Sequence, residues 1–445
     1  MNSKTGATPM PGTEQPLAER GREAGPARAV TGAAINEPRP AVNRRYTTLI
    51  IAGLAALGPF SIDTYFPSFP ALAAHFGVTE IQVQGTLSFY LAALAGMNLF
   101  HGSLSDSFGR RRVILVSLGV YTMTALGCVV APSFAWLLGL RVIQGLAGGA
   151  GMIVSRALIR DCFAGAEAQK FMAEVTMVSG LGPAIAPILG GWLHVWFGWR
   201  GPFLFLTLLG AALWCACQAK LPESLPRHLR HSFHPGPLFR SYLATMSQPG
   251  FLLLCLALGF GGGGFLLYVA TAADVATHVL GLSATQFGWL FLPLVSGLVL
   301  GAAVSRRLAG VLSPARFVKY GFSLMSLGAA LNIVASLAQT PRVPWAVLPL
   351  AVYTFGFALL APVVTIQGLD VFPEHRGLAS SLQGFSHVLI FALIAGPVAP
   401  LVAHSGLKHA LGLALLMFLS WLAYYGSQIY AAGAPRARGA GARSR

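Results

Sequence analysis

The feature that most constrains this chain is a series of long apolar runs, most of them near twenty residues, that fill most of it. A helix of about twenty apolar residues crosses the roughly 30 Å hydrocarbon core of a bilayer. Continuous runs of this length favour helices over the shorter strands of a membrane barrel. We therefore expect an all-α membrane protein with twelve transmembrane helices. The runs are 46–70, 82–101, 112–131, 135–157, 169–193, 200–219, 250–273, 285–304, 316–337, 343–366, 377–401 and 407–430.

Composition supports this fold class. Hydrophobic residues make up 55% of the 445 residues and charged residues only 10%, which excludes a soluble or a disordered chain. The formal net charge of +16 would suit a nucleic-acid partner, but the basic residues lie almost entirely at the ends of the apolar runs. The expected partner is therefore the lipid bilayer and not a nucleic acid.

The basic residues also predict the topology. With twelve spans and both termini in the cytoplasm, 26 of the 30 lysines and arginines fall on the cytoplasmic side. Arg200, Arg342 and Lys408 fall outside, and Arg141 lies within a span. Such an excess of basic residues in cytoplasmic loops is typical of membrane proteins.

A long internal loop divides the spans into two groups of six. It carries Pro222, Pro226, Pro235 and Pro237 and is expected to be a linker with little regular structure. Two bundles of six helices suit a transporter that binds its substrate near the middle of the membrane. The predicted segments are a disordered cytoplasmic tail (1–45), an N-terminal six-helix bundle (46–219), a cytoplasmic linker (220–249), a C-terminal six-helix bundle (250–430) and a basic cytoplasmic tail (431–445).

No metal site or disulfide is expected. The five cysteines fall in or beside apolar runs without the spacing of metal ligands and are interpreted as buried thiols. His228, His231 and His234 recur at a spacing of three, but Pro235 follows them and no acidic residue or cysteine joins them. A basic, lipid-facing loop is the favoured interpretation of this stretch.

The loop between the second and third spans orients the rest of the chain. It runs from Gly102 to Arg112, and its two glycines, Gly102 and Gly109, would allow a sharp reversal. Asp106 supplies one negative charge, and three consecutive arginines place the loop in the cytoplasm. The pattern Gly-x-Leu-x-Asp-x-x-Gly-Arg-Arg at this position resembles the signature loop of the major facilitator superfamily.

Ionisable residues deep in a membrane are costly, so each is a candidate functional residue. Asp63 lies roughly 10 Å below the outer end of the first span, and Arg141 lies roughly 9 Å deep in the fourth. At matching depths the two groups could form an ion pair, or one could respond when the other changes protonation. Glu174, in the fifth span, is the second candidate proton site; the alternative is an interfacial carboxylate that reaches water or pairs with Lys170. Asp274 lies at the end of a span and is expected to face water.

Four stretches resemble one branch of that superfamily, the drug:proton antiporters of the bicyclomycin and chloramphenicol resistance type. The first span has Asp63-Thr-Tyr-Phe-Pro-Ser-Phe-Pro70, similar to the branch's Asp-x-Tyr-Leu-Pro-x-x-Pro. The fourth span has Arg141-Val-Ile-Gln-Gly145 and, later, Arg156-Ala-Leu-Ile-Arg-Asp161, which look like Arg-x-x-Gln-Gly and Arg-Ala-x-x-Arg-Asp. The fifth span resembles the antiporter motif through Gly182, Pro183, Pro187, Gly190 and Gly191.

The resemblance implies a major facilitator fold in a bacterial inner membrane and assigns roles to these residues. Asp63 would bind the coupled proton, and Arg141 would tune the affinity of that carboxylate for it. Asp106 would form a cytoplasmic gate with Arg110 and Arg111, together with the glycines Gly102 and Gly109. The glycines and prolines of the fifth span would let helices pack closely and prevent a proton leak, although simple packing of small residues is an equal alternative.

The implied activity is export of drugs or amphipathic small molecules in exchange for protons, by a monomer with no cofactor. The alternative is a proton-coupled or facilitative carrier of one metabolite. An enzyme is not expected, because no catalytic motif was found. Departures such as Asn98, where the branch has glutamine, make the substrate the weakest inference. The residues expected to line the substrate cavity are Tyr65, Tyr90, Asn98, Gln144, Tyr268 and Phe357.

Overall fold

The computed structural model describes residues 44–163, 165–230, 235–276, 280–338, 345–403 and 405–433, and within 165–180 it places few side chains. The described part that follows Pro38 forms a single compact unit. Its regular structure is helical, and no strand longer than an isolated bridge occurs among the described residues. The expected all-α class is therefore confirmed.

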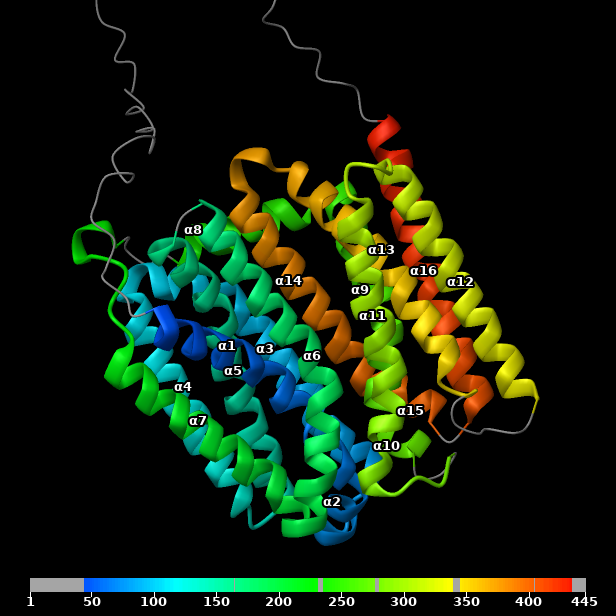
Figure 1. Cartoon of the computed structure of the whole chain (residues 1–445), viewed down its shortest axis with the longest axis horizontal. Helices are drawn as coiled ribbons and strands as arrows, with labels where there is room; N and C mark the ends of the chain where they lie inside the picture. Colours follow the sequence, from blue (N-terminus) through cyan, green and yellow to red (C-terminus); the bar gives the residue numbers. More distant parts are fainter. Residues whose placement is uncertain are drawn as a thin grey trace, which may run out of the picture. The chain divides into compact units, whose positions relative to one another are not determined.

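The first helices, drawn in blue to green in Figure 1, follow one another with short connections. They are α1 (Arg44–Asp63), η2 (Phe66–Ser68), α2 (Phe69–Phe76), α3 (Glu80–Phe108), α4 (Arg110–Val129), α5 (Phe134–Cys162), α6 (Gly165–Phe197), η3 (Gly198–Arg200) and α7 (Gly201–Lys220). Within this set α1 packs on α5, α6 and α7, while α5 packs on α3 and α4.

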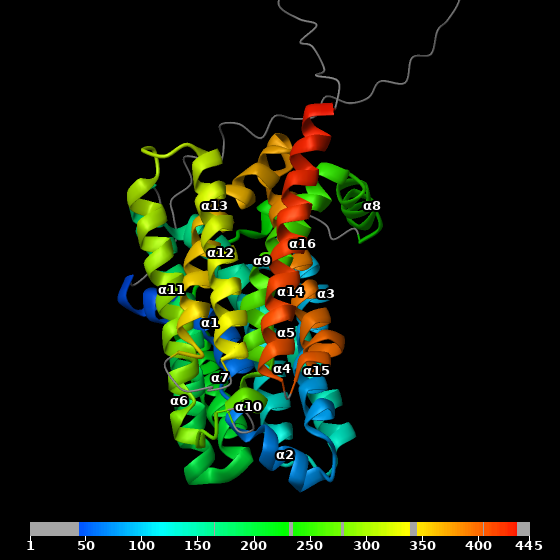
Figure 2. The same ribbon diagram turned by 90° about the vertical axis from the view of Figure 1, so that its right-hand side faces the viewer.

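The remaining helices pack mainly on one another. They are η4 (Arg227–Leu229), α8 (Pro235–Met246), α9 (Pro249–Ala270), α10 (Ala272–Asp274), η6 (Ala284–Gln286), α11 (Gly288–Leu308), α12 (Pro314–Leu337), α13 (Leu348–Asp370), η7 (Pro373–His375), α14 (Arg376–Leu393), η8 (Ile394–Val398), α15 (Ala399–Val402) and α16 (Gly406–Gly433). Figure 2 shows α12, α13 and α16 side by side, and α12 contacts both of the others. The two sets meet where α3 packs on α14 and α6 packs on α11.

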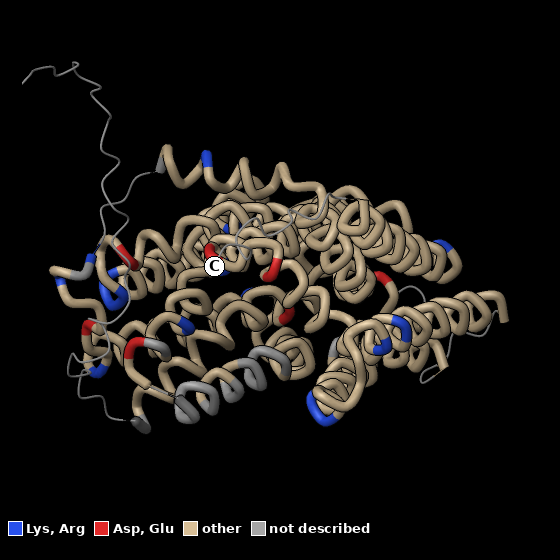
Figure 3. Tube along the Cα trace, turned by 90° about the horizontal axis from the view of Figure 1, so that it is seen from above, with Lys and Arg blue, Asp and Glu red and all other residues tan. Residues whose placement is uncertain are grey.

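Eleven segments of the described chain are long and apolar enough to cross a membrane. One of them, Leu181–Lys220, is 40 residues long and contains the end of α6 and the whole of α7. The turn η3 separates these two helices, and Gly198 begins it with a φ of +63°, a value that favours glycine. Most of the chain's trace carries no charge, as the tan tube of Figure 3 shows.

Two ends of the helices are distinguished below. The Arg110 end is where α3 ends and α4 begins, and the Thr79 end is where α3 begins. Thr79 caps α3, because its hydroxyl accepts the backbone N–H of Gln82 at 3.2 Å while the Gln82 side chain accepts the N–H of Thr79 at 2.9 Å. In Figure 1, α8 lies toward the top, and α2, α10 and α15 lie toward the bottom, which is the Thr79 end.

Three local expectations from the sequence were wrong. Gly102 does not form a turn, because α3 continues through it to Phe108, and only Gly109, with a φ of +98°, is non-helical between α3 and α4. Asp274 does not face water: it is 8% exposed, because α10 packs against η2. Cys215 is exposed, whereas the other four cysteines are buried.

The linker also contains more regular structure than expected, because it includes the twelve-residue helix α8. Pro235 begins this helix, and a proline in a first turn interrupts no hydrogen bond of the helix. Leu238, Tyr242 and Met246, spaced four residues apart, pack on a cluster of buried residues that includes Phe251. His231 and His234 lie outside the described residues.

Candidate functional site

Asp63 lies where the first membrane segment changes direction. Pro67 has no N–H to donate to the carbonyl of Asp63, so α1 ends there and the chain continues through the short turn η2 into α2. The candidate span runs from Tyr46 to Phe76, six residues beyond the predicted end, so Asp63 lies near its middle. Only 3% of Asp63 is exposed. A carboxyl group is thus buried at a helix break inside the apolar part of the molecule.

Arg141 of α5 is completely buried, and two aromatic rings enclose its guanidinium group. The guanidinium carbon lies 4.5 Å from the ring centroid of Tyr65 and 4.2 Å from that of Tyr90. Its Nη1 donates to Oε1 of Gln144 at 2.7 Å, and its Nη2 donates to the backbone carbonyl of Ser61 at 3.1 Å. Ring faces and carbonyl dipoles stabilise a cation that has left water. The positive charge is therefore held without a carboxylate.

The ion pair between Asp63 and Arg141, one of the two alternatives left open by the sequence, is not formed in this conformation. Both residues are described, and the guanidinium bonds to the carbonyl of Ser61 and to Gln144 instead. Equal depth places two residues at the same level in the membrane. It does not place their side chains face to face, because the direction of a side chain rotates by about 100° around the helix axis with each residue. The Asp63 carboxyl group can consequently gain or lose a proton without breaking an ion pair in this state.

The residues expected to line a substrate cavity fall into two sets. Tyr65, Tyr90 and Gln144 surround Arg141, as described above. Asn98 of α3 lies against Gly149, where a Cβ atom would overlap its side-chain oxygen. Two members of the other set of helices have different neighbours. Tyr268 of α9 lies 5.6 Å from His409, measured between ring centroids. The Phe357 ring of α13 lies so close to α9 that a Cβ atom on Gly261 or Gly262 would press against it.

At the Arg110 end, a charged cluster joins three helices. The side chain of Arg110 contacts the carboxylate of Asp106, donates to the hydroxyl of Ser105 at 2.6 Å, and bonds to Oδ2 of Asp161 at 3.2 Å. Arg111 does not join this contact, because its guanidinium donates to the backbone carbonyl of Gln218 at 2.7 Å. The expected pair of Asp106 and Arg110 is present, and its role as a gate stays a prediction.

Sequence reasoning missed two carboxylates of this cluster. Asp161 belongs to a quoted motif but was given no role, and it accepts a hydrogen bond from the hydroxyl of Ser224 at 2.8 Å. Glu223, in the linker, accepts the backbone N–H of Arg110 at 2.9 Å and so caps α4. The sequence could have pointed to both carboxylates, because acidic residues are scarce in this chain, which has only 14 of them. Gly109 leaves room for this arrangement, since a Cβ atom there would overlap the Glu223 carboxylate.

The glycines of the fifth-span motif bring α6 close to α1. A Cβ atom on Gly182 would overlap the ring of Pro59, and one on Gly190 would overlap the backbone carbonyl of Thr64. Gly191 is buried as well, and Pro183 and Pro187 lie within α6. Close packing beside Asp63 is therefore present. A role in blocking a proton leak stays a prediction.

Glu174 lies in α6, but its side chain lies outside the part of the structure that is described. Its predicted proton-binding role is therefore not tested. The described residues contain no group of three or more histidine, cysteine or acidic side chains that could hold a metal ion.

The two sets of helices touch closely at the Thr79 end. Nε2 of Gln84 in α3 donates to the carbonyl of Ala270 at 2.9 Å, and the hydroxyl of Ser88 donates to the carbonyl of Ala392 at 2.7 Å. At the Arg110 end, a pocket of about 580 Å³ lies between α3, α5, α8 and α14. Gly102, Asp106 and Arg110 are among its lining residues. Among the described residues, hydrogen bonds thus join the two sets at the Thr79 end, and a pocket separates them at the Arg110 end.

Apolar helices long enough to span a bilayer, with a buried cation and a buried carboxyl group between them, define a polytopic membrane protein with a polar site inside the membrane. Residues 50–396 match the family model of the Major Facilitator Superfamily, and the chain belongs to this family. It is therefore a transporter and not an enzyme, as expected from the sequence.

Several curated relatives are similar over most of their length. The chain is 27% identical to a bicyclomycin resistance protein homolog of Haemophilus influenzae, over 85% of this chain and 94% of the relative. It is 27% identical to multidrug resistance protein D of Escherichia coli, over 84% and 94%. It is also 27% identical to a chloramphenicol resistance protein of Acinetobacter baumannii, over 71% and 76%. The expected resemblance to this branch is confirmed.

Solved structures share the fold. An inward-facing bacterial homolog of the human lysosomal transporter Spinster superimposes with a TM-score of 0.66 at 16% identity, over 88% of this chain and 98% of that one. The human organic anion transporter MFSD10 gives a TM-score of 0.61 at 19% identity, over 86% and 99%. The family, the candidate spans and the bacterial relatives together indicate a multi-pass protein of a bacterial inner membrane.

Proposed function

We propose that this transporter exports drugs or amphipathic small molecules in exchange for protons, by alternating access between two six-helix bundles. The observation that carries the proposal is Asp63, a buried carboxyl group at a helix break with no ion-pair partner among the described residues. Such a group can take up a proton from one side and release it to the other. A protonmotive force of 100 mV supplies about 2.3 kcal/mol per proton, enough to support a modest substrate gradient.

The two bundles would consist of α1–α7 and α9–α16, which gives twelve spans when Leu181–Lys220 is counted as two. The contact pattern supports this division, because each set packs mainly within itself. Hydrogen bonds between the two sets at the Thr79 end, together with a pocket at the Arg110 end, suit one of the two alternating states. The proposed coupling ion is the proton, and the proposed functional unit is a monomer.

The proposed orientation places the Arg110 end and both termini in the cytoplasm. The charge asymmetry supports it, because Arg110, Arg111 and Arg112 share one end of α4 and Arg306 and Arg307 lie in the last turn of α11. In this orientation the pocket at the Arg110 end opens to the cytoplasm, where an exporter collects its substrate.

The test is proton movement in liposomes that contain the purified protein. Chloramphenicol and a cationic drug are added across a fixed pH gradient to the native chain and to Asp63→Asn. We expect drug-triggered proton flux in the native protein and none in Asp63→Asn. The matched control is Asp370→Asn, which makes the same change at an exposed carboxylate paired with Arg376 at 2.8 Å and should leave the flux intact.

Two results would change the assignment. Flux that survives in Asp63→Asn would move the proton site elsewhere, with Glu174 as the next candidate. Absence of flux with every drug would favour the second candidate function, a proton-coupled or facilitative carrier of one metabolite. The resistance proteins among the relatives favour export over that alternative.

A further inference from the structure

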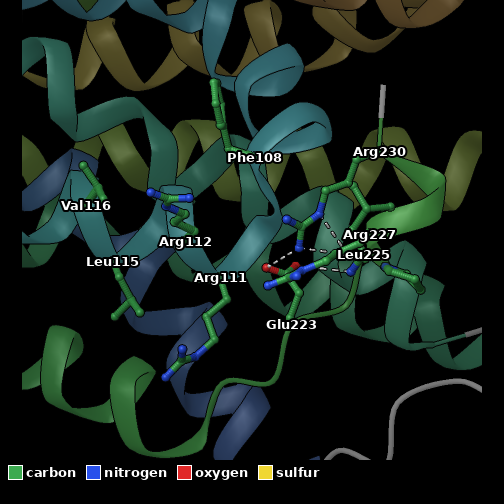
Figure 4. A pocket seen from close by; sticks show the side chains of 10 residues that line it. Phe108, Arg111, Arg112, Leu115, Val116, Glu223, Leu225, Arg227 and Arg230 are labelled. Carbon is green, nitrogen blue, oxygen red and sulfur yellow. Dashed lines mark hydrogen bonds and ion pairs between the residues drawn. The ribbon is translucent and has the colours of Figure 1, made fainter. Parts of the chain in front are cut away.

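A second pocket at the Arg110 end is lined by four arginines. It has a volume of about 600 Å³ and lies between the start of α4 and the linker. Arg111 and Arg112 come from α4, and Arg227 and Arg230 come from the linker. Figure 4 shows that the two pairs come from different elements on either side of Glu223. Glu223 is the one carboxylate among the lining residues, so the lining has a large excess of positive charge.

Contacts within the protein neutralise only part of the positive charge of these arginines. Arg230 lies 3.5 Å from Glu223 and donates to the carbonyl of Leu225 at 3.3 Å. Arg111 donates to a backbone carbonyl, as described above. The side chains of Arg112 and Arg227 are exposed and have no hydrogen bond or ion pair with any described residue. An adjoining pocket of about 430 Å³ shares Arg111 and adds Lys220.

The other wall of the pocket is apolar and faces outward from the helices. Phe108 is 47% exposed and Val116 is 61% exposed, and Leu115 lies beside them. Val116 is four residues beyond Arg112 in the same candidate membrane span, about 6 Å further along the helix. The pocket thus passes from cationic to apolar at the point where a span enters the membrane.

We propose that this pocket binds an anionic phospholipid of the surrounding leaflet. Arginine binds phosphate oxygens through paired N–H groups, and the lining supplies arginines from two elements around one cavity. The apolar wall of Phe108, Leu115 and Val116 suits the first methylenes of an acyl chain, which a free anion lacks. A neutral zwitterionic lipid would leave the excess positive charge unmatched.

Such a lipid would lie beside the charged cluster of the proposed gate. Its phosphate would compete with Glu223 for Arg230, and Glu223 also holds the first N–H of α4. The binding itself does not require the proposed transport activity. A failed binding test and a failed transport test are therefore distinguishable.

The test is a lipid titration of the delipidated, full-length protein, followed by native mass spectrometry with tetraoleoyl cardiolipin. The informative variant is Arg112→Gln with Arg227→Gln. Its matched control is Arg306→Gln with Arg307→Gln, which removes the same charge at the end of α11, away from this pocket. We expect the affinity for cardiolipin to fall about tenfold or more in the first and to change little in the second.

Three results would overturn the proposal. Equal losses in both double variants would indicate general attraction to a basic surface. Equally tight binding of phosphatidylcholine would indicate an acyl-chain site alone, and displacement of cardiolipin by millimolar inorganic phosphate would indicate a free-anion site. The thermal midpoint of each variant checks folding. If the double variant unfolds, the single change Arg227→Gln in the exposed linker carries the comparison.

Discussion

Arg141 lies over the ring of Tyr90, with its guanidinium carbon 4.2 Å from the ring centroid, and it bonds to the backbone of α1 and not to Asp63. The buried cation thus joins α5, α1 and α3 through a ring face and a carbonyl. A substitution that keeps the positive charge but replaces the planar guanidinium group should reduce both transport and stability, because an ammonium group cannot reproduce this set of contacts.

We therefore expect Arg141→Lys to reduce drug-driven proton flux about tenfold and to lower stability by about 1–3 kcal/mol, the cost of buried groups left without partners. Flux in liposomes and the thermal midpoint in detergent measure the two effects. Arg200→Lys is the matched control, since Arg200 lies 4.1 Å over the ring of Trp199 but is exposed. Similar losses in both variants would argue against a special role for the buried arginine.

The close approach of α6 to α1 gives a second prediction. Gly190→Ala places a methyl group on the carbonyl of Thr64, so backbone has to move, which costs about 1–3 kcal/mol. The thermal midpoint should fall accordingly. Gly139→Ala in α5 is the control, because a Cβ atom there meets nothing within 4 Å and alanine favours the helix. An unchanged midpoint in Gly190→Ala would show that the two helices can separate freely.

Some features could be predicted from the sequence because they depend only on the order of residues along the chain. Span length, span order and the charged ends follow from apolar runs and basic residues. The Asp63–Arg141 pair could not be settled this way, because matching depth leaves the rotation of each helix open. Glycine in a motif is similarly ambiguous: Gly109 forms a turn, whereas Gly102 lies inside α3.

The linker shows a second reason why the sequence did not predict the whole fold. Its prolines indicated irregular structure, but a proline is tolerated in the first turn of a helix, and Pro235 occupies that position in α8. What stabilises α8 is contact with distant residues. The hydroxyl of Tyr242 donates to the carbonyl of Leu99 in α3 at 2.8 Å, a contact between residues 143 positions apart. No local pattern specifies such a partner.

The contacts at the Thr79 end give a third prediction. Gln84→Ala with Ser88→Ala removes two hydrogen bonds that join α3 to carbonyls of the other set of helices. At about 1 kcal/mol each, their loss should shift the population toward the state open at this end by roughly tenfold or more. Spin labels at Thr79 and Ser283, both exposed, would report a longer distance in a variant without native cysteines.

Ser296→Ala is the control for that experiment, because this hydroxyl bonds only to the carbonyl of Leu292 in its own helix, at 2.7 Å. Its distance distribution should match that of the unaltered protein. A distribution that also stays unchanged in the double variant would show that side-chain hydrogen bonds do not hold this end closed.

The charged cluster at the Arg110 end gives the last prediction, on a residue that the sequence reasoning left without a role. Asp161→Asn removes one of the two carboxylates that contact Arg110, whose side chain is only 10% exposed. A partly buried cation that loses a partner costs more than an exposed one, so we expect a loss of about 1–3 kcal/mol in stability. Asp370→Asn, in which both partners are more than half exposed, should cost less than about 1 kcal/mol. Thermal unfolding in one detergent compares the two, and equal midpoints would show that Asp106 alone suffices for Arg110.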